Sequence, residues 1–286
     1  MKRAYFKYIL ALLLFGSNGV AASHIGLTSY EIVLLRSLLG SILLIVVFFF
    51  AKPKLTALHH KKDMIYIALS GMAMGADWLF LFEAFAQIGV SIGTLINYLG
   101  PVIVVAISPL LFKERITGFK LMALFMVLLG VFFISGQAVI QGSSTWGLIC
   151  AGLSAISYAA MVIFNKKSRQ VTGLENATLQ LLFAFLTVAV FFGLKQGFYI
   201  EITAGDWLPI LWIGLLNTGV GCYLYFSSIG NLPVQTVAIC GYLEPLSAVV
   251  FSLIFLHETM LPLQVLGAVL IIGGALFGES HARVKK

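Results

Sequence analysis

Long apolar stretches separated by short polar segments make up nearly the whole chain. Each stretch holds roughly 20 residues, which is enough to cross a bilayer as an α-helix. Ten such stretches lie near residues 1–22, 30–51, 64–86, 91–112, 118–138, 146–165, 175–195, 206–228, 234–256 and 262–279. The pattern predicts an all-α polytopic membrane protein in which short loops connect the helices.

One segment of this pattern occurs twice. The first copy begins Tyr98-Leu99-Gly100-Pro101 and ends at Glu114, and the second begins Tyr242-Leu243-Glu244-Pro245 and ends at Glu258. An offset of 144 overlays the two copies without a gap, and six of their 17 positions are identical. The repeat predicts two five-helix halves, residues 1–142 and 143–286. Because five is odd, the halves enter the membrane from opposite faces, as ten transmembrane helices in two inverted repeats.

The first stretch has two interpretations. Lys2, Arg3 and Lys7 precede an apolar run that ends near Ser23, a pattern that resembles a secretory signal peptide. We interpret it as a retained helix, because residues 146–165 occupy the equivalent place in the second half. Cleavage near Ser23 would leave the first half one helix short.

Composition and charge support a membrane location. The chain is 60% hydrophobic and 10% charged, whereas a soluble domain carries about 25% charged residues. Of its 18 Lys and Arg residues, all but Arg36 and Lys195 fall in segments on one side of the predicted membrane. Because cytoplasmic loops retain basic residues, this predicts a protein of the cell (inner) membrane with both termini in the cytoplasm. It also explains the net charge of +7 better than nucleic-acid binding does.

The sequence offers no sign of a cofactor, a metal or a catalytic centre. Cys150, Cys222 and Cys240 are scattered singly, and the five His residues form no cluster. No HExxH or CxxC element and no nucleotide-binding P-loop is present. We therefore expect no cofactor, and we regard a membrane-embedded enzyme or an ATP-driven pump as poor interpretations.

At this level of detail the chain resembles the EamA family of the drug/metabolite transporter superfamily. The resemblance rests on ten helices in two inverted halves, each with a Pro and a Glu bracketing its fourth helix. Leu14-Phe15-Gly16-Ser17-Asn18 also resembles the family's aromatic-Gly-Ser-Asn opening, although Phe15 stands where Trp is common. The resemblance covers nearly the whole chain. It implies a secondary carrier, often an exporter of amino acids or related metabolites.

Two acids inside apolar stretches are the first candidate site residues. Glu244 and Asp77 lie near the middle of their spans, and their repeat partners are Gly100 and Gly221. Ionisable groups at membrane depth are costly and usually mark a pathway or a site. We expect a central acid that binds a proton or a cationic group, with the opposite glycine leaving room for a ligand. The alternative is an acid that only aids packing.

Arg36 is the third ionisable candidate, since a guanidinium can pair with a substrate carboxylate. The alternatives are pairing with Glu31 or Glu83, or an extended side chain that reaches the outer surface. Four uncharged residues complete the predicted substrate-binding set: Asn18, Trp78, Tyr98 and Tyr242.

Three further features have structural interpretations. Pro101 and Pro245 lie inside helical spans, where each would bend its helix. Glu114 and Glu258 suit the positive end of the next helix. Glycines spaced by four allow close helix packing, within the chain or at a homodimer seam, as in Gly71/Gly75, Gly89/Gly93 and Gly274/Gly278.

The function that these patterns favour is secondary-active transport of a small metabolite by alternating access, and we expect an amino acid or related compound that is exported against proton entry. Export and proton coupling come from the resemblance and the buried acids. A nucleotide sugar is disfavoured because an anionic substrate would want several basic residues in the spans, and apart from those toward the ends of the chain or of a span we find Arg36 alone. A drug-like cation stays possible as cargo, and a channel is disfavoured because no ring of like charges is seen.

Overall fold

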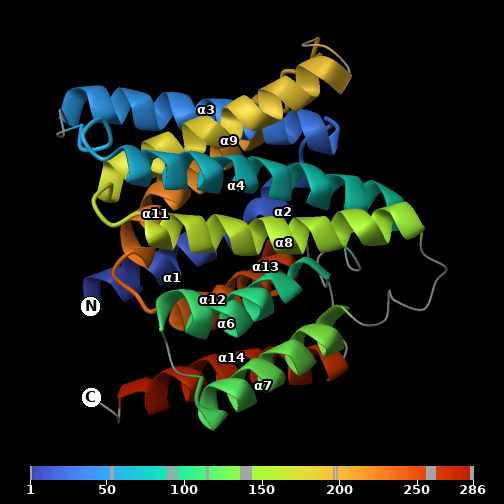
Figure 1. The fold of residues 1–286 in the computed structure, drawn as a ribbon. Coiled ribbons are helices and arrows are strands. Elements are labelled where there is room, and N and C mark those ends of the chain that lie inside the picture. The colour runs from blue at the N-terminus through green and yellow to red at the C-terminus, as the bar shows by residue number, and fades with distance from the viewer. Residues whose placement is uncertain are drawn as a thin grey trace.

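A computed structural model describes residues 2–51, 55–88, 93, 96–113, 116–135, 144–195, 197, 199–255 and 262–283. Within these residues every regular element is a helix (Figure 1). The elements are α1 (Lys2–Gly16), α2 (Asn18–Ala22), α3 (Ser29–Ala51), α4 (Lys61–Ile88), α6 (Leu99–Phe112), α7 (Gly118–Ser135), α8 (Thr145–Lys167), α9 (Gly173–Lys195), α10 (Trp207–Leu211), the π-helix η2 (Trp212–Val220), α11 (Gly221–Ile229), α12 (Val234–Gly241), α13 (Leu243–Phe255) and α14 (Pro262–Arg283).

By length and composition, six helical segments can cross a membrane. They are Lys2–Ala22, Ser29–Ala51, Lys61–Ile88, Thr145–Lys167, Gly173–Lys195 and Trp207–Ile229. Shorter apolar helices occupy the places of the other four predicted spans, and α12 and α13 together cover residues 234–255. Many large apolar side chains point outward, as in a protein surrounded by lipid; Leu110 and Leu194 are 83% and 85% exposed. The prediction of an all-helical polytopic membrane protein is confirmed.

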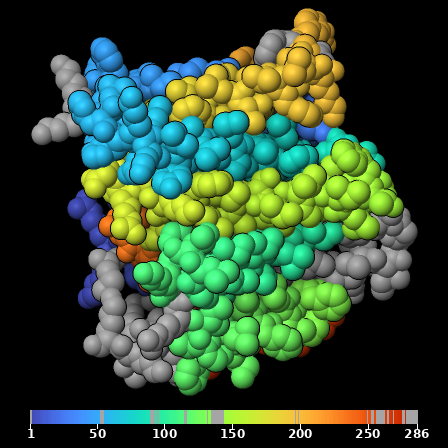
Figure 2. Space-filling view, viewed as in Figure 1, coloured from blue at the N-terminus to red at the C-terminus, as the bar shows by residue number. Residues whose placement is uncertain are grey.

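The helices pack in layers (Figure 1). α3 and α9 lie together on one side of α4, and α8 lies against the other side, next to α6. α1 packs against α11 and α13, while α7 packs mainly against α14 at the far side of the bundle. The space-filling view shows α4, α8, α6 and α7 in succession across one face (Figure 2). Side chains from both predicted halves therefore meet at the centre of the bundle.

Small residues permit the closest helix contacts. A Cβ on Gly71 would lie 2.5 Å from the carbonyl oxygen of Gln180, and one on Gly75 would lie 2.8 Å from that of Ala184. α4 therefore approaches the backbone of α9 directly, which agrees with packing within the chain. Similarly, a Cβ on Gly130 would lie 2.6 Å from the carbonyl oxygen of Gly267, so α7 and α14 are equally close.

The sequence suggested that each of the two repeat prolines bends its helix from within, but the structure shows otherwise. Pro101 and Pro245 are each the third residue of a new helix, α6 and α13. The break precedes them, at Tyr98 and Tyr242, which end the preceding helical segments. A proline in the first turn lacks an N–H that would have no helical partner there anyway, so it is tolerated. Glu114 and Glu258, which end the two copies, lie outside the described residues.

The start of α10 is tied to the turn that follows α2. The Asp206 carboxylate accepts a hydrogen bond from the Thr203 hydroxyl at 2.7 Å and another from the Gly26 amide at 3.0 Å. These bonds hold the pKa of Asp206 below its usual range, and the bond from the Thr203 hydroxyl has the largest effect. They fasten the loop before the Trp207–Ile229 span to the segment between α2 and α3.

Candidate functional site

A cavity of about 300 Å³ lies at the centre of the bundle. Its walls come from α1, α2, α3, α4, α8, α11 and the two repeat segments. Six of the seven predicted site residues line it: Asn18, Arg36, Asp77, Trp78, Tyr98 and Glu244. These residues are far apart in the sequence, and the packing of the helices brings them to one space.

Asp77 is fixed by the protein. Its side chain is 6% exposed, and its Oδ1 accepts hydrogen bonds from Asn97 Nδ2 at 2.9 Å and from Ser154 Oγ at 2.6 Å. Asn97 comes from the segment before α6 and Ser154 from α8. Asp77 thereby connects α4 to two other parts of the cavity wall, so it has a packing role as well as a place beside the cavity.

Glu244 differs from Asp77 in its surroundings. It lies in the first turn of α13 and lines the cavity, and it is half-buried. Among the described residues its carboxylate has no ion-pair partner within 4.0 Å, and no hydrogen bond to that carboxylate is found there. Of the two predicted acids, Glu244 is therefore the one whose carboxylate is available to a ligand or a proton.

Arg36 lies inside the cavity wall and does not reach the surface. It is 8% exposed, its Nε donates to Thr218 Oγ1 at 2.9 Å, and its guanidinium carbon lies 4.7 Å from the centre of the Trp78 ring. That distance places the cation over the ring face in a cation–π contact. Trp78 and Arg36 therefore contact each other within the cavity wall.

The acids proposed from the sequence as partners of Arg36 bind elsewhere. Glu31 accepts hydrogen bonds from the backbone N–H and the hydroxyl of Thr28. Glu83 forms an ion pair with Lys195 at 3.3 Å. The prediction that Glu83 pairs with Arg36 is wrong, because α9 packs beside α4 and carries Lys195 to that acid.

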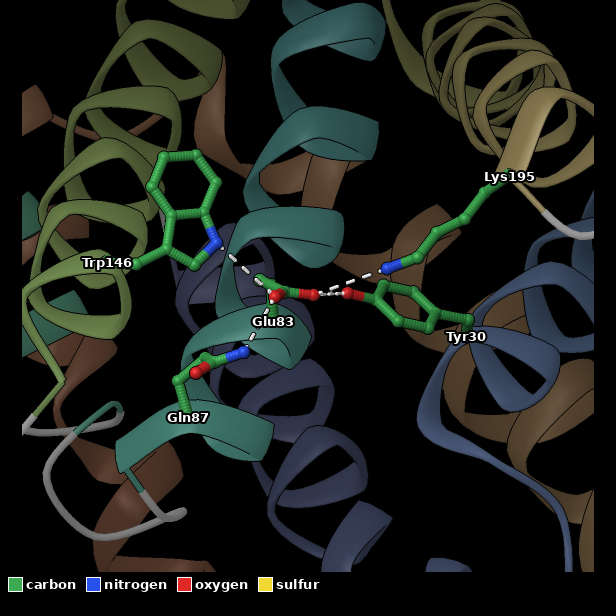
Figure 3. Close-up of polar contacts among 5 residues, drawn as sticks. All are labelled: Tyr30, Glu83, Gln87, Trp146 and Lys195. Atoms are coloured by element: carbon green, nitrogen blue, oxygen red, sulfur yellow. Dashed lines mark hydrogen bonds and ion pairs between the residues drawn. The ribbon is translucent and has the colours of Figure 1, made fainter.

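Glu83 is the centre of a separate polar cluster (Figure 3). One carboxylate oxygen accepts from the Tyr30 hydroxyl and contacts Lys195; the other accepts from Gln87 and from Trp146 Nε1, at 3.2 and 3.3 Å. The Lys195 ammonium also lies 4.0 Å from the centre of the Tyr30 ring. The cluster joins α3, α4, α8 and α9 at one end of the bundle.

Of the two tyrosines, Tyr98 lines the cavity and Tyr242 does not. Tyr242 is fully buried, and its hydroxyl donates to the backbone carbonyl of Tyr98 at 2.7 Å. The two rings are 5.8 Å apart. The two matched tyrosines of the repeat therefore contact each other, and the buried Tyr242 holds Tyr98 in place.

The glycines opposite the acids do not leave room for a ligand, contrary to the expectation from the repeat. A Cβ on Gly100 would lie 2.7 Å from Cδ1 of Tyr158, and one on Gly221 would lie 2.6 Å from Cε1 of Phe15. The missing side chains are replaced by two aromatic rings, both of which line the cavity. The glycines set the position of these rings.

Polar residues that the sequence analysis did not select hold the predicted ones in place. Ser154 binds Asp77, and Thr218 binds Arg36. Asn217 donates to Ser17 Oγ and to Asn18 Oδ1, both at 2.9 Å. Asn217 and Thr218 are adjacent polar residues within an apolar span, which is the signal that could have identified them.

The cavity extends toward one end of the bundle. Asn18 and Gly19 line it from α2, and Phe82 and Phe85 line it from the last turns of α4. At the other end, the fully buried Tyr8 of α1 donates to the carbonyl oxygen of Val237 at 2.6 Å.

Lys166 joins two helices at that other end. It lies at the end of α8 and donates to the carbonyl oxygens of Ile229 and Gly230 at 2.9 and 3.0 Å, and to that of Leu232. These contacts join α8 to the turn between α11 and α12 at the end of the bundle where α1 begins.

Within the described residues no group of three His, Cys, Asp or Glu side chains is placed to hold a metal ion. The cavity offers side chains that can bind a ligand. It combines one guanidinium, one fixed carboxylate, one available carboxylate and walls rich in aromatic rings.

Comparisons with known proteins agree with this architecture. The chain is 26% identical over 277 residues to the "Uncharacterized transporter YxxF" of Bacillus subtilis (strain 168), which covers 95% of this chain and 88% of that protein. It is 24% identical over 279 residues to the "Riboflavin transporter ImpX" of Fusobacterium nucleatum subsp. nucleatum, covering 92% and 93%. A crystal structure with 18% identity superimposes with a TM-score of 0.83 over 96% of this chain and 98% of the other, which shows the same fold.

The sequence model of the EamA-like transporter family matches residues 2–136 and again residues 145–277. The two matches together span nearly the whole chain, and the curated relatives that we compared are named as transporters. Secondary carriers hold their substrate near mid-depth between helices, and this bundle has a cavity at its centre. The chain therefore belongs to the EamA-like transporter family.

Proposed function

We propose that this protein is a secondary carrier that exports a small metabolite, an amino acid or a related compound, in exchange for protons. The observation that carries the proposal is the central cavity, where the Glu244 carboxylate has no partner among the described residues while Arg36 lies in the same wall. A ligand with both a cationic and an anionic group would match this pair of charges. The remaining lining is largely aromatic and apolar and suits a compact organic molecule.

The proposed mechanism is alternating access by two inverted halves, with both termini in the cytoplasm. Packing supports it: α4 lies against α8 as α11 lies against α1, and α6 lies against α8 as α13 lies against α1. An offset of 144 residues relates α1 to α8, α4 to α11 and α6 to α13. Two halves related in this way can rock about a site at mid-depth and open it to either side.

Glu244 is the proposed proton carrier. An acid that faces a cavity inside the membrane is a common element of proton relays. Asp77 is less suited to this task, because Asn97 and Ser154 already bind its carboxylate. We assign Asp77 to the shape of the site, together with Trp78, Tyr98 and Asn18.

A second candidate substrate is riboflavin. One relative that aligns with 92% of this chain is named a riboflavin transporter. The aromatic rings of Phe15, Trp78 and Tyr158 in the cavity wall are compatible with a planar ring system. Riboflavin therefore belongs in the first substrate panel beside the amino acids.

Counterflow in proteoliposomes tests the proposal. Vesicles loaded with an unlabelled compound and diluted into the labelled compound should accumulate label transiently if the protein is a carrier, for at least one of the twenty L-amino acids or riboflavin. An imposed pH gradient should drive net movement. A channel would only equilibrate the label, and an enzyme would alter the compound.

Glu244→Gln is the variant that tests the coupling. It should retain expression and lose the response to the pH gradient. Glu201→Gln is the matched control, because Glu201 is exposed, bonds to Tyr199 and lies outside the spans. Equal pH-driven transport by both variants would exclude Glu244 as the proton carrier.

A further inference from the structure

Arg36 has more hydrogen-bond donors than the protein uses. A guanidinium carries five N–H donors in a rigid plane, and the described residues provide one acceptor, Thr218 Oγ1. The one ion pair within 4.0 Å in the described part of the chain joins Lys195 to Glu83. A cation that is 8% exposed and lacks a contacting carboxylate is costly in a membrane unless something else compensates it. The terminal amino groups of Arg36 are thus the donors left for a ligand.

The single acceptor comes from an unusual backbone segment. Thr218 lies in η2, a π-helix of nine residues in the middle of the Trp207–Ile229 span. π-Helical turns are rare and occur frequently at functional sites. Here the adjacent residues Asn217 and Thr218 both bind cavity elements: Asn217 binds Ser17 and Asn18, and Thr218 binds Arg36.

Close packing of α3 on η2 fixes the distance between Arg36 and Thr218. Gly40 lies one helical turn beyond Arg36, on the same face of α3. A Cβ on Gly40 would lie 3.0 Å from Cγ2 of Thr218 and 3.2 Å from the carbonyl oxygen of Gly214, and one on Gly214 would lie 2.7 Å from Cβ of Leu39. Neither helix can rotate or withdraw freely, so the Thr218 hydroxyl has a defined place relative to the guanidinium.

Trp78 provides the second contact that restrains the Arg36 guanidinium. Its ring centre lies 4.7 Å from the guanidinium carbon, while Nε is bonded to Thr218. A guanidinium whose Nε is engaged keeps the edge formed by its two terminal amino groups. That edge forms two parallel hydrogen bonds with a carboxylate.

We propose that Thr218 is a positioning residue that holds Arg36 to receive the carboxylate of the transported molecule. The cavity would then prefer an amino acid to the amine that lacks its carboxylate. The assignment rests on the proposed function, and it adds a selection rule and a residue to it: the carboxylate is selected through Thr218, whereas Glu244 faces the cationic group.

Three variants separate positioning from a structural role. Thr218→Val keeps the shape of the side chain and removes the acceptor, and Thr218→Ser restores a hydroxyl. Thr187→Val is the matched control, because the Thr187 hydroxyl bonds to the Phe183 carbonyl within its own helix and does not line the cavity. The probes are the twenty L-amino acids and, for the strongest binder, its decarboxylated amine. Binding to the purified full chain is measured by the shift in apparent Tm across a concentration series.

Thr218→Val should weaken binding of the amino acid about fivefold, the equivalent of one lost hydrogen bond. It should change binding of the amine by less than about twofold, since the amine makes no contact with Arg36. Thr218→Ser should restore the preference, and Thr187→Val should leave it unchanged.

Two results would overturn the assignment alone. These are an equal loss for amino acid and amine in Thr218→Val, or a wild-type protein that binds both equally. If the wild type binds none of the twenty amino acids, the proposed amino-acid substrate falls, and the role of Thr218 falls with it. Normal counterflow of riboflavin would then show that the carrier function itself survives.

Discussion

Replacing Lys166 by methionine removes the ammonium that joins the end of α8 to the turn between α11 and α12. The acceptors are the carbonyl oxygens of Ile229, Gly230 and Leu232, at and beyond the end of α11. The last carbonyls of a helix lack helical partners and carry its partial negative charge, so a cation is well placed there. Methionine keeps the length and the helix propensity of the side chain. The change therefore tests the ammonium and little else.

Each charge-assisted hydrogen bond contributes about 1.5–3 kcal/mol, but Lys166 is half-buried and its ammonium competes with water. We expect a total loss of about 2 kcal/mol in the free energy of unfolding for Lys166→Met. Lys167→Met is the control, with the same charge change one residue away. The Lys167 ammonium is likewise half-buried and lies 5.8 and 6.0 Å from the centres of the Tyr66 and Phe164 rings, which are weak contacts of about 0.5–1 kcal/mol.

Two measurements check this prediction. Unfolding in detergent, followed by tryptophan fluorescence, compares the stability of the two variants. Spin labels on cysteines introduced at Arg169 and Asn231, in a background without the native cysteines, report the distance between the α8 end and the α11–α12 turn. Lys166→Met should add a population at longer distance that Lys167→Met lacks. Equal stability losses together with unchanged distances would refute the claim that Lys166 holds the end of α8 against the α11–α12 turn.

Further predictions concern the scaffold. Gly71→Ala should lower the free energy of unfolding by about 1–3 kcal/mol, because its Cβ would strike the α9 backbone. Gly152→Ala is the control and should be neutral or stabilising, because nothing lies within 4 Å of a Cβ there. Thermal unfolding compares the two variants. Glu83→Gln should cost about 1 kcal/mol or less in the same assay, because its ion pair with Lys195 is partly exposed. The hydrogen bonds that lower the pKa of Asp206 stabilise the fold fully above about pH 4, and this contribution is lost as the pH falls through the lowered value. Asp206→Asn should therefore flatten the acid limb of a plot of Tm against pH, and an unchanged limb would contradict this.

The sequence predicted the helical spans and much of the cavity lining because both leave strong signals. Asp77, Glu244 and Arg36 are rare ionisable groups inside apolar stretches, and such groups rarely face lipid. They converge because α3, α4 and α13 all border the centre of the bundle. A single physical rule therefore located most of the polar wall.

The supporting contacts could not be predicted in the same way. Thr218 is useful because η2 is a π-helix, and apolar periodicity does not distinguish that register from an α-helix. Gly100 and Gly221 suggested open space, but which ring fills such a gap depends on how α1 and α8 cross their neighbours. The partner of Glu83 depended likewise on the contact of α4 with α9, which no local pattern records.

The pairing of α7 with α14 has a consequence for how the protein is made. Helices α8 to α13 are all synthesised after α7 and before its main partner. Until then, the α7 face that bears Gly130, which later rests against the backbone of Gly267, has no protein surface to meet. Chains fold progressively from the N-terminus during synthesis. Until α14 is made, this face of α7 therefore contacts lipid or an insertion factor. The C-terminal helix therefore completes the first half of the molecule as well as the second, and a nascent chain halted before α14 would leave both halves unfinished.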